Sequence, residues 1–190
     1  MRSYRMLPEG YKECVQIDLQ KDQKLAFRLN LFALACMILM IGMGIGLVPG
    51  FMQHGFLGVL LSVFLGLLGM AVYIVLHEIV HGIFMYLFSG VKPRFGLTVL
   101  YAYAGSEVYF CKVPYIVIAL APVVIWGILL FILCVTTYGT RWFWPTYFVE
   151  VYNVCGAVGD YYVTWKFLKM KKKILVRDTG DRMTAYEREC

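Results

Sequence analysis

An apolar run from residue 56 to residue 88, with three ionisable side chains inside it, is the feature that most constrains the fold. A helix of this length measures roughly 50 Å, whereas the hydrocarbon core of a bilayer is roughly 30 Å thick. Apart from His77, Glu78 and His81, the run has no side chain that could be charged near neutral pH. Ionisable groups in hydrocarbon are costly and need a partner or a metal, so these side chains predict a functional site inside a membrane.

The segment His77-Glu78-Ile79-Val80-His81 has the spacing of a zinc-binding helix. Residues four apart lie on one face of a helix, so both imidazoles can bind one Zn²⁺. Glu78 can then act as general base towards a water molecule that the metal activates, which predicts hydrolysis of peptide bonds. The alternatives are a buried histidine pair that is hydrogen-bonded to a neighbouring helix, and a haem or proton-relay site.

The composition predicts a multi-pass membrane protein. The 190 residues are 61% hydrophobic and 16% charged, with a mean hydropathy of +0.69, which lies outside the range of a soluble domain of this length. Hydropathy predicts four transmembrane helices, at about 25–48, 56–88, 113–135 and 143–168. The expected fold is an all-α polytopic membrane protein with one membrane domain, 25–168.

Basic residues predict the orientation of this domain. Six Lys or Arg residues lie at 2–28, three lie between the second and third predicted helices, and eight lie from Lys166 to Arg188, whereas the other two loops share only Arg141. By the positive-inside rule, the N-terminal segment 1–24, the middle loop and the basic tail 169–190 are cytoplasmic. This topology accounts for the net charge of +6, and no nucleic-acid partner is expected. The lipid bilayer is an expected partner, and lysines of the tail could contact anionic headgroups.

A zinc site of this kind needs a third protein ligand, and Asp160 is the predicted one. His81 and Asp160 each lie eight residues before the expected cytoplasmic end of a helix, so both are about 12 Å deep. Glu150 lies about 15 Å further along the same helix, which favours a buried polar contact. Glu150, Glu107 and a cysteine are the other candidate ligands, and Asp160 could instead be a carboxylate hydrogen-bonded to a tyrosine.

Between the second and third predicted helices, residues 95–111 predict a cytoplasmic-side β-hairpin that turns at Gly105-Ser106. Its expected strand residues are aromatic or β-branched: Thr98, Val99, Tyr101 and Tyr103 before the turn, and Val108, Tyr109 and Phe110 after it. An edge strand beside the zinc site could bind an unwound substrate by strand addition. An interfacial loop without substrate contact is the alternative.

The order of these features resembles a known family. The segment from His77 to His81 near the end of a membrane helix, a strand-like loop, a further helix and then Asn153-Val-Cys-Gly-Ala-Val-Gly-Asp160 resemble the site-2 protease core. The short layout, from about residue 25 to 175, is similar to small bacterial membrane proteins grouped as a putative zincin peptidase family, a domain of unknown function.

The resemblance implies that His77, His81 and Asp160 bind zinc and that Glu78 activates water. It also implies that Asn153 helps to hold the substrate strand. The chain departs from site-2 proteases next to the aspartate, because glycines precede Asp160 where those enzymes usually have a proline, and a tyrosine follows where they have a glycine.

The sequence therefore predicts a zinc metalloprotease of the bacterial cytoplasmic membrane, with both termini cytoplasmic. Its expected substrates are peptide segments or membrane proteins, cleaved in or next to the membrane near the cytoplasmic face. The alternative is a non-proteolytic membrane protein, a scaffold or a transporter subunit, with a structural zinc site. Glu78 distinguishes these functions, because hydrolysis needs a general base and a structural site does not.

Overall fold

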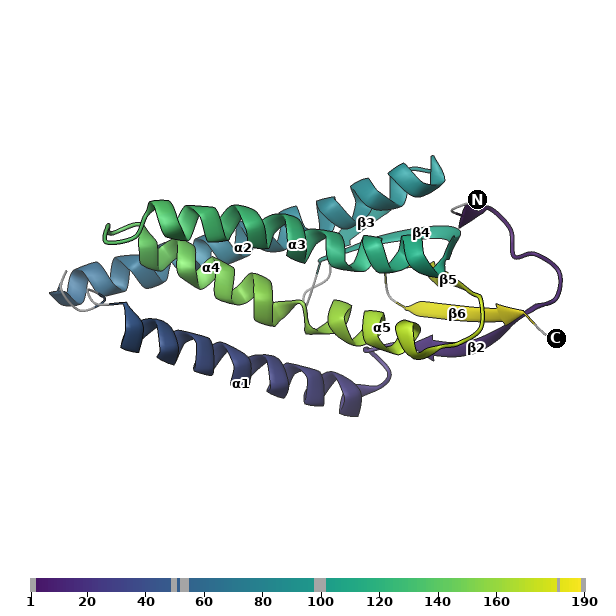
Figure 1. Cartoon of the computed structure of the whole chain (residues 1–190), viewed down its shortest axis with the longest axis horizontal. Helices are drawn as coiled ribbons and strands as arrows, with labels where there is room; N and C mark the ends of the chain where they lie inside the picture. The colour runs from purple at the N-terminus through teal and green to yellow at the C-terminus, as the bar shows by residue number, and fades with distance from the viewer. Residues whose placement is uncertain (1–2, 49–50, 52–54, 98–101, 181, 189–190) are drawn as a thin grey trace. The chain divides into compact units, whose positions relative to one another are not determined.

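The computed structural model describes residues 3–48, 51, 55–97, 102–180 and 182–188. In this part of the chain there are five helices and six strands, which Figure 1 labels in chain order. Their bounds are β1 Ser3–Tyr4, β2 Tyr11–Ile17, α1 Gln23–Leu47, α2 Gly55–Ser89, β3 Arg94–Leu97, β4 Ala102–Cys111, α3 Lys112–Thr136, α4 Phe143–Gly156, α5 Val158–Lys169, β5 Ile174–Asp178 and β6 Met183–Arg188.

Three helices, α1, α2 and α3, are long and apolar enough to cross a membrane. They coincide closely with the first three predicted transmembrane segments. Many of their large apolar side chains are exposed, which is expected for helix surfaces that face lipid and have no protein neighbour to cover them.

The prediction of an all-α protein with four transmembrane helices was wrong. The fourth predicted segment, 143–168, consists of α4 and α5, which have 14 and 12 residues and are separated at Ala157. A membrane-spanning helix needs about 20 residues, so neither is long enough. Gly156 and Gly159 flank the break. Glycine is a poor helix former, which explains why an apolar segment does not continue as one helix here.

A six-stranded sheet also contradicts the prediction of an all-α protein, because it makes the protein mixed α/β. The strand order is β1-β4-β5-β6-β2, and β3 also pairs with β4. All of these pairs are antiparallel. The longest pairing between distant segments runs from Tyr11 opposite Arg188 to Ile17 opposite Met183. The N-terminal segment and the C-terminal tail are therefore partners in one sheet with the middle loop.

The prediction of a hairpin that turns at Gly105-Ser106 was wrong, although β3 pairs with β4 in this region. Both residues lie inside β4, where Gly105 pairs with Arg94 of β3. Thr98, Val99 and Tyr101 lie outside the described residues. A glycine is needed at 105 because a Cβ atom there would collide with the backbone of Thr179 and lie 2.8 Å from the nitrogen of Gly180. Close backbone approach, and not a turn, explains this glycine.

The chain divides into two compact units, and each has its own core. The first unit comprises 1–28, 78–122 and 160–190, and it contains the whole sheet. Its core joins one face of the sheet to the helices of the same unit, and its most deeply buried members include Phe110, Phe167 and Val176. Burial of such side chains is the main stabilising term for this unit, at about 1.5–3 kcal/mol each.

The second unit comprises 29–77 and 123–159. Its core is aromatic, with Phe143, Trp144 and Phe148 of α4 around Cys134. The hydroxyl of Tyr147 donates a hydrogen bond to the backbone oxygen of Met40 at 2.6 Å, which ties α4 to α1. This unit therefore supports the helical segment that leads along α2 to His77.

Candidate metal centre

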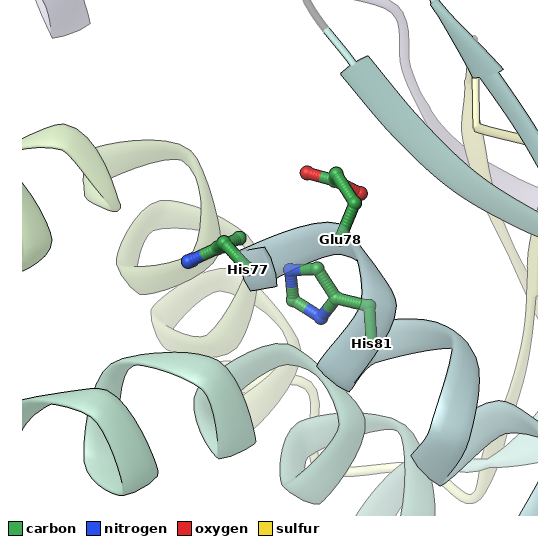
Figure 2. A group of neighbouring side chains, drawn as sticks. All are labelled: His77, Glu78 and His81. Carbon is green, nitrogen blue, oxygen red and sulfur yellow. The ribbon is translucent and has the colours of Figure 1, made fainter. Parts of the chain in front are cut away.

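One turn of α2 carries the three side chains that the sequence singled out. Possible ligand atoms of His77, Glu78 and His81 all lie within 4.8 Å of one another (Figure 2). His77 and Glu78 are partly buried, and His81 exposes 9% of its surface. The helical spacing thus brings two imidazoles and a carboxylate together, as the motif predicted.

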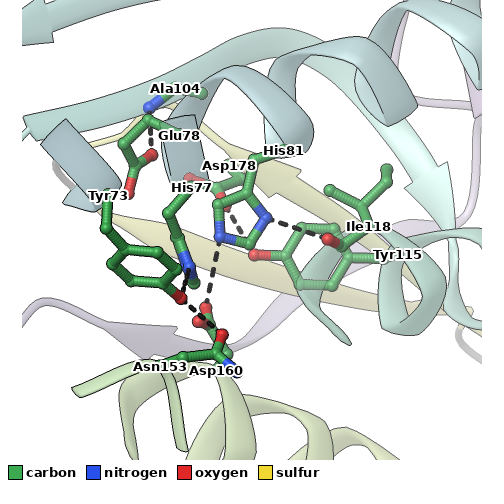
Figure 3. Close-up of polar contacts among 10 residues, drawn as sticks. All are labelled: Tyr73, His77, Glu78, His81, Ala104, Tyr115, Ile118, Asn153, Asp160 and Asp178. Atoms are coloured by element: carbon green, nitrogen blue, oxygen red, sulfur yellow. Dashed lines mark hydrogen bonds and ion pairs between the residues drawn. The ribbon is translucent and has the colours of Figure 1, made fainter. Parts of the chain in front are cut away.

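The hydrogen bonds of His77 determine which of its nitrogens faces the site. The hydroxyl of Tyr73 donates to Oδ1 of Asn153 at 2.6 Å and lies 2.8 Å from Nδ1 of His77 (Figure 3). Because the tyrosine proton goes to Asn153, the tyrosine oxygen accepts a bond from the Nδ1–H of His77. The Nε2 atom of His77 therefore carries the lone pair, as a metal ligand requires.

His81 is oriented in the same way by a different partner. Its Nδ1 lies 2.9 Å from the backbone oxygen of Ile118, which can only accept a hydrogen bond, so Nδ1 carries the proton. The Nε2 atom lies 3.6 Å from Oδ1 of Asp160, in the first turn of α5 (Figure 3). Nε2 of the ring and the carboxylate of Asp160 thus face each other. A positive charge between these atoms, either a bound metal ion or the proton of an imidazolium, satisfies both of them.

Zinc fits this donor set. Two ligands of a tetrahedral Zn²⁺, each bonded at about 2.0–2.2 Å, lie roughly 3.4 Å apart, close to the separation of His81 Nε2 and Asp160 Oδ1. Two neutral histidines and one carboxylate are the ligands of several catalytic zinc sites, which keep a fourth position for water or substrate. His81 and Asp160 therefore have the spacing of two zinc ligands, and His77 belongs with His81 to the group of possible ligands on α2.

Glu78 is held by the sheet. Its Oε2 accepts a hydrogen bond from the backbone N–H of Ala104 in β4, at 2.8 Å (Figure 3). This contact fixes the carboxylate in orientation, while a carboxylate has further lone pairs available for proton transfer. Strand β4 thus positions the predicted general base.

A second buried carboxylate near the site was missed by the sequence reasoning. Asp178, at the end of β5, is 7% exposed, and it accepts hydrogen bonds from the hydroxyl of Tyr115 at 2.5 Å and from the N–H of Gly180 at 2.9 Å. Burial raises the pKa of Asp178, and the two hydrogen bonds oppose this rise.

The residues that support the site differ in whether the sequence could have identified them. Tyr73 lies four residues before His77, so helical spacing could have identified it. Asp178, by contrast, lies about a hundred residues from the histidines in sequence, and no local pattern connects it with them.

The structure places Asn153 and Glu150 together in the second unit. Asn153 has 0% exposure, and its amide nitrogen lies 3.2 Å from Oε2 of Glu150 and 3.4 Å from the backbone oxygen of Val123. Its observed contact with the zinc site is indirect, through Tyr73. A role in holding substrate stays a prediction, and contact with a peptide would require Asn153 to give up some of these partners.

The other candidate ligands have different surroundings. Glu107 is half exposed and pairs with Arg177 and, at 3.6 Å, with Arg94. The five described cysteines are free thiols, and none belongs to the metal-binding group found among the described residues.

A comparison with protein families gives a match that covers this site. A family model described as putative zincin peptidase matches residues 70–175, which is more than half of the chain and includes His77, Glu78, His81 and Asp160. No curated protein and no solved structure matches the chain.

Proposed function

Because the chain belongs to the putative zincin peptidase family, we propose that it is a membrane-embedded zinc metalloprotease that cleaves transmembrane or juxtamembrane peptide segments. The observation that carries the proposal is the contact between His81 Nε2 and Asp160. His81 lies about one turn after Glu78 in α2, an apolar helix of 35 residues. The family implies a zinc peptidase. The resemblance to the site-2 protease core and the cleavage of substrates in the membrane are parts of the proposal.

The ion would be held by Nε2 of His77 and Nε2 of His81, whose Nδ1 atoms are already hydrogen-bonded, and by the carboxylate of Asp160. When bound there, zinc would lower the pKa of a water molecule and polarise the carbonyl of the scissile peptide bond. Tyr73 and the backbone oxygen of Ile118 hold the Nδ1–H groups of the two imidazoles and so orient both rings.

Glu78 would carry the proton during hydrolysis. Its carboxylate accepts a proton from the attacking water while the water oxygen forms a bond with the carbonyl carbon. The same group then donates this proton to the leaving nitrogen as the carbon–nitrogen bond breaks. The hydrogen bond from Ala104 holds the carboxylate in place for both transfers.

The position of the site along α2 supports cleavage near one membrane surface. His81 lies eight residues before the end of α2 at Ser89, about 12 Å along the helix. That end leads into β3 and β4, in segments that also carry basic residues. We therefore place the site near the cytoplasmic face of a bacterial cytoplasmic membrane, with both termini cytoplasmic, by the positive-inside rule.

The test combines zinc content and cleavage in detergent-purified protein. Wild type is expected to hold about one zinc per chain and to cleave an unfolded membrane peptide. Glu78→Gln should keep the zinc and lose cleavage, by about a hundredfold or more. Asp160→Ala should lose both, whereas Glu107→Gln, which removes an exposed carboxylate, should lose neither.

Other outcomes have clear meanings. Zinc without cleavage in wild type would favour the alternative, a non-proteolytic scaffold or transporter subunit with a structural zinc site. Zinc retained in Asp160→Ala would place the third ligand elsewhere. Absence of zinc from wild type would exclude the metalloprotease.

A further inference from the structure

The helix that carries Asp160 also carries an exposed apolar stripe. Tyr161, Trp165 and Leu168 of α5 lie at spacings of four and three residues, so they share one face of the helix, and Trp165 is 54% exposed. The opposite face, with Val163 and Phe167, is buried in the core of the first unit. The helix is therefore packed on one side and presents large apolar side chains on the other.

Lysines border this stripe. The Nζ of Lys169 lies 4.0 Å from the centre of the Trp165 ring, and that of Lys166 lies 5.6 Å from the centre of the Tyr162 ring. Three further lysines, at 171–173, follow the helix and are exposed. Between residues 161 and 173 there are five lysines and no acidic residue. Lys172 forms an ion pair with Glu187 at 3.0 Å, so its charge is already compensated.

This combination matches the interface of a membrane. Tryptophan and tyrosine are enriched at the level of the lipid headgroups, and lysine side chains extend along apolar surface to place their charge there. Clustered lysines are attracted to anionic lipids. A lysine ammonium group that lies over an aromatic ring contacts the ring with only one side. Its other N–H groups can still donate to a phosphate.

We propose that the outer face of α5, together with residues 170–173, binds the headgroups of anionic phospholipids. The phosphate groups would contact Lys166, Lys169, Lys171 and Lys173. Tyr161, Trp165 and Leu168 would face the glycerol and upper acyl region. The occupant is a membrane lipid because the stripe is apolar, the cluster is cationic, and the same chain has three helices that are apolar enough to cross a bilayer.

Headgroup binding to this face would also affect the zinc site, because α5 is short and carries Asp160. The helix has 12 residues, begins after the break at Ala157 and has Asp160 in its first turn. Its other end is already fixed by Lys112, whose Nζ donates to the backbone oxygens of Leu168 at 3.3 Å and Met170 at 2.6 Å. Lipid bound between these ends would restrain the helix and so hold Asp160 against His81. This step rests on the proposed role of Asp160 as ligand.

The first test measures lipid binding by the full chain in nanodiscs. Native mass spectrometry would count lipids retained from discs of phosphatidylcholine mixed with phosphatidylglycerol. Wild type is expected to retain phosphatidylglycerol about fivefold or more over its share in the disc. A variant with Lys166→Gln, Lys169→Gln, Lys171→Gln and Lys173→Gln should lose most of this preference.

The matched control removes four positive charges elsewhere in the first unit, with Arg5→Gln, Lys12→Gln, Lys92→Gln and Arg188→Gln. It should keep the preference of wild type. Equal retention by the α5 variant and the control, or no preference in wild type, would overturn the proposal. Circular dichroism of all three proteins shows whether each is folded.

The second test measures the loss of zinc to a chelator in discs with and without phosphatidylglycerol. Loss from wild type should be several times slower with the anionic lipid, and the α5 variant should show no such difference. A lipid preference without an effect on zinc would overturn the link to Asp160. Neither test needs peptide cleavage, so failure here is distinguishable from failure of the proposed protease activity.

Discussion

The hydrogen bond from Tyr115 to Asp178 joins α3 to β5 beside the predicted zinc ligands. Tyr115→Phe would remove this donor and leave a buried carboxylate with one partner fewer, so we expect a loss of about 1–3 kcal/mol in the free energy of unfolding. Thermal unfolding in detergent measures it. Tyr138→Phe, which removes an exposed hydroxyl, should have almost no effect. Equal effects of the two substitutions would contradict this account.

Asp178 should also give stability a specific pH dependence. Burial raises its pKa, so the folded protein holds this proton more tightly than the unfolded chain. Its contribution to stability is therefore greatest below the ordinary pKa of aspartate and is lost as the pH rises through the raised pKa. Asp178→Asn does not titrate, so its stability relative to wild type should improve as the pH rises from about 4, the ordinary pKa of aspartate, through the neutral range. Thermal unfolding across this range would show a constant difference if the idea were wrong.

Tyr73 is expected to act on zinc through His77. Tyr73→Phe removes the oxygen that accepts the Nδ1–H of His77, and loss of such a supporting hydrogen bond lowers metal affinity by about 10–100-fold. Competition with a chromophoric chelator measures this affinity. Tyr152→Phe is the control, because the Tyr152 ring packs against Tyr73 and its hydroxyl has no observed bond to His77. A similar loss in both variants would indicate a packing effect.

Residues of the site were predictable where the signal is local. His77, Glu78 and His81 follow from helical spacing, and Asp160 was chosen by its depth along a predicted helix, although that helix is broken just before it. Ala104 and Asp178 could not be found in this way. Ala104 acts through its backbone, which has no sequence signature, and Asp178 reaches the site only through the pairing of β5 with β4.

At the scale of elements, Gly105 tests the close approach of β4 to the turn after β5. Gly105→Ala would push the added methyl group into the backbone of Thr179, and backbone cannot move as easily as a side-chain tip. We expect a loss of about 1–3 kcal/mol. Gly42→Ala, inside α1 with open space around it, should stabilise the protein by about 0.5–1 kcal/mol. Denaturant unfolding would contradict this explanation if both substitutions had the same sign.

Among the elements, the long helices could be predicted from the sequence, whereas the break between α4 and α5 and the sheet could not. The three long helices were predicted because each is a continuous apolar run. The break between α4 and α5 was not, since hydropathy averages over a window and Ala157 is apolar. The sheet was missed because β2 and β6 are short, contain charged residues and have partners far away in the sequence. Pairing between distant strands has no local pattern.

At the scale of the whole molecule, the sheet constrains the topology independently of charge. It combines strands from before α1, from between α2 and α3, and from after α5. Strands of one sheet lie on one side of a membrane, so the chain must return to that side after each helical section. This agrees with the distribution of Lys and Arg, which is richest in the same three segments.

Labelling of single cysteines in a cysteine-free background tests this topology. Cysteines at Lys12, Arg94 and Lys173 should react with a membrane-impermeant maleimide from the same side of the membrane, the cytoplasmic side in our proposal. A cysteine at Tyr138, in the turn between α3 and α4, should react only from the other side if α3 crosses the membrane. Sealed vesicles of both orientations give the comparison. Lys12 and Lys173 on opposite sides would be incompatible with the sheet.

The pairing of β2 with β6 also determines at which point of synthesis the sheet can be completed. β2 is made before any of the helices, and its partner is made after all of them. The ribosome therefore delivers α1, α2 and α3 while β2 still has an unpaired edge, which its charged residues Lys12 and Glu13 make unattractive to other chains. Asp160 is made after β2, α1, α2 and α3, because it lies in α5. A nascent chain that already contains His77, Glu78 and His81 thus lacks a complete hydrolytic centre, and the order of translation itself delays the proposed activity until α5 has been made.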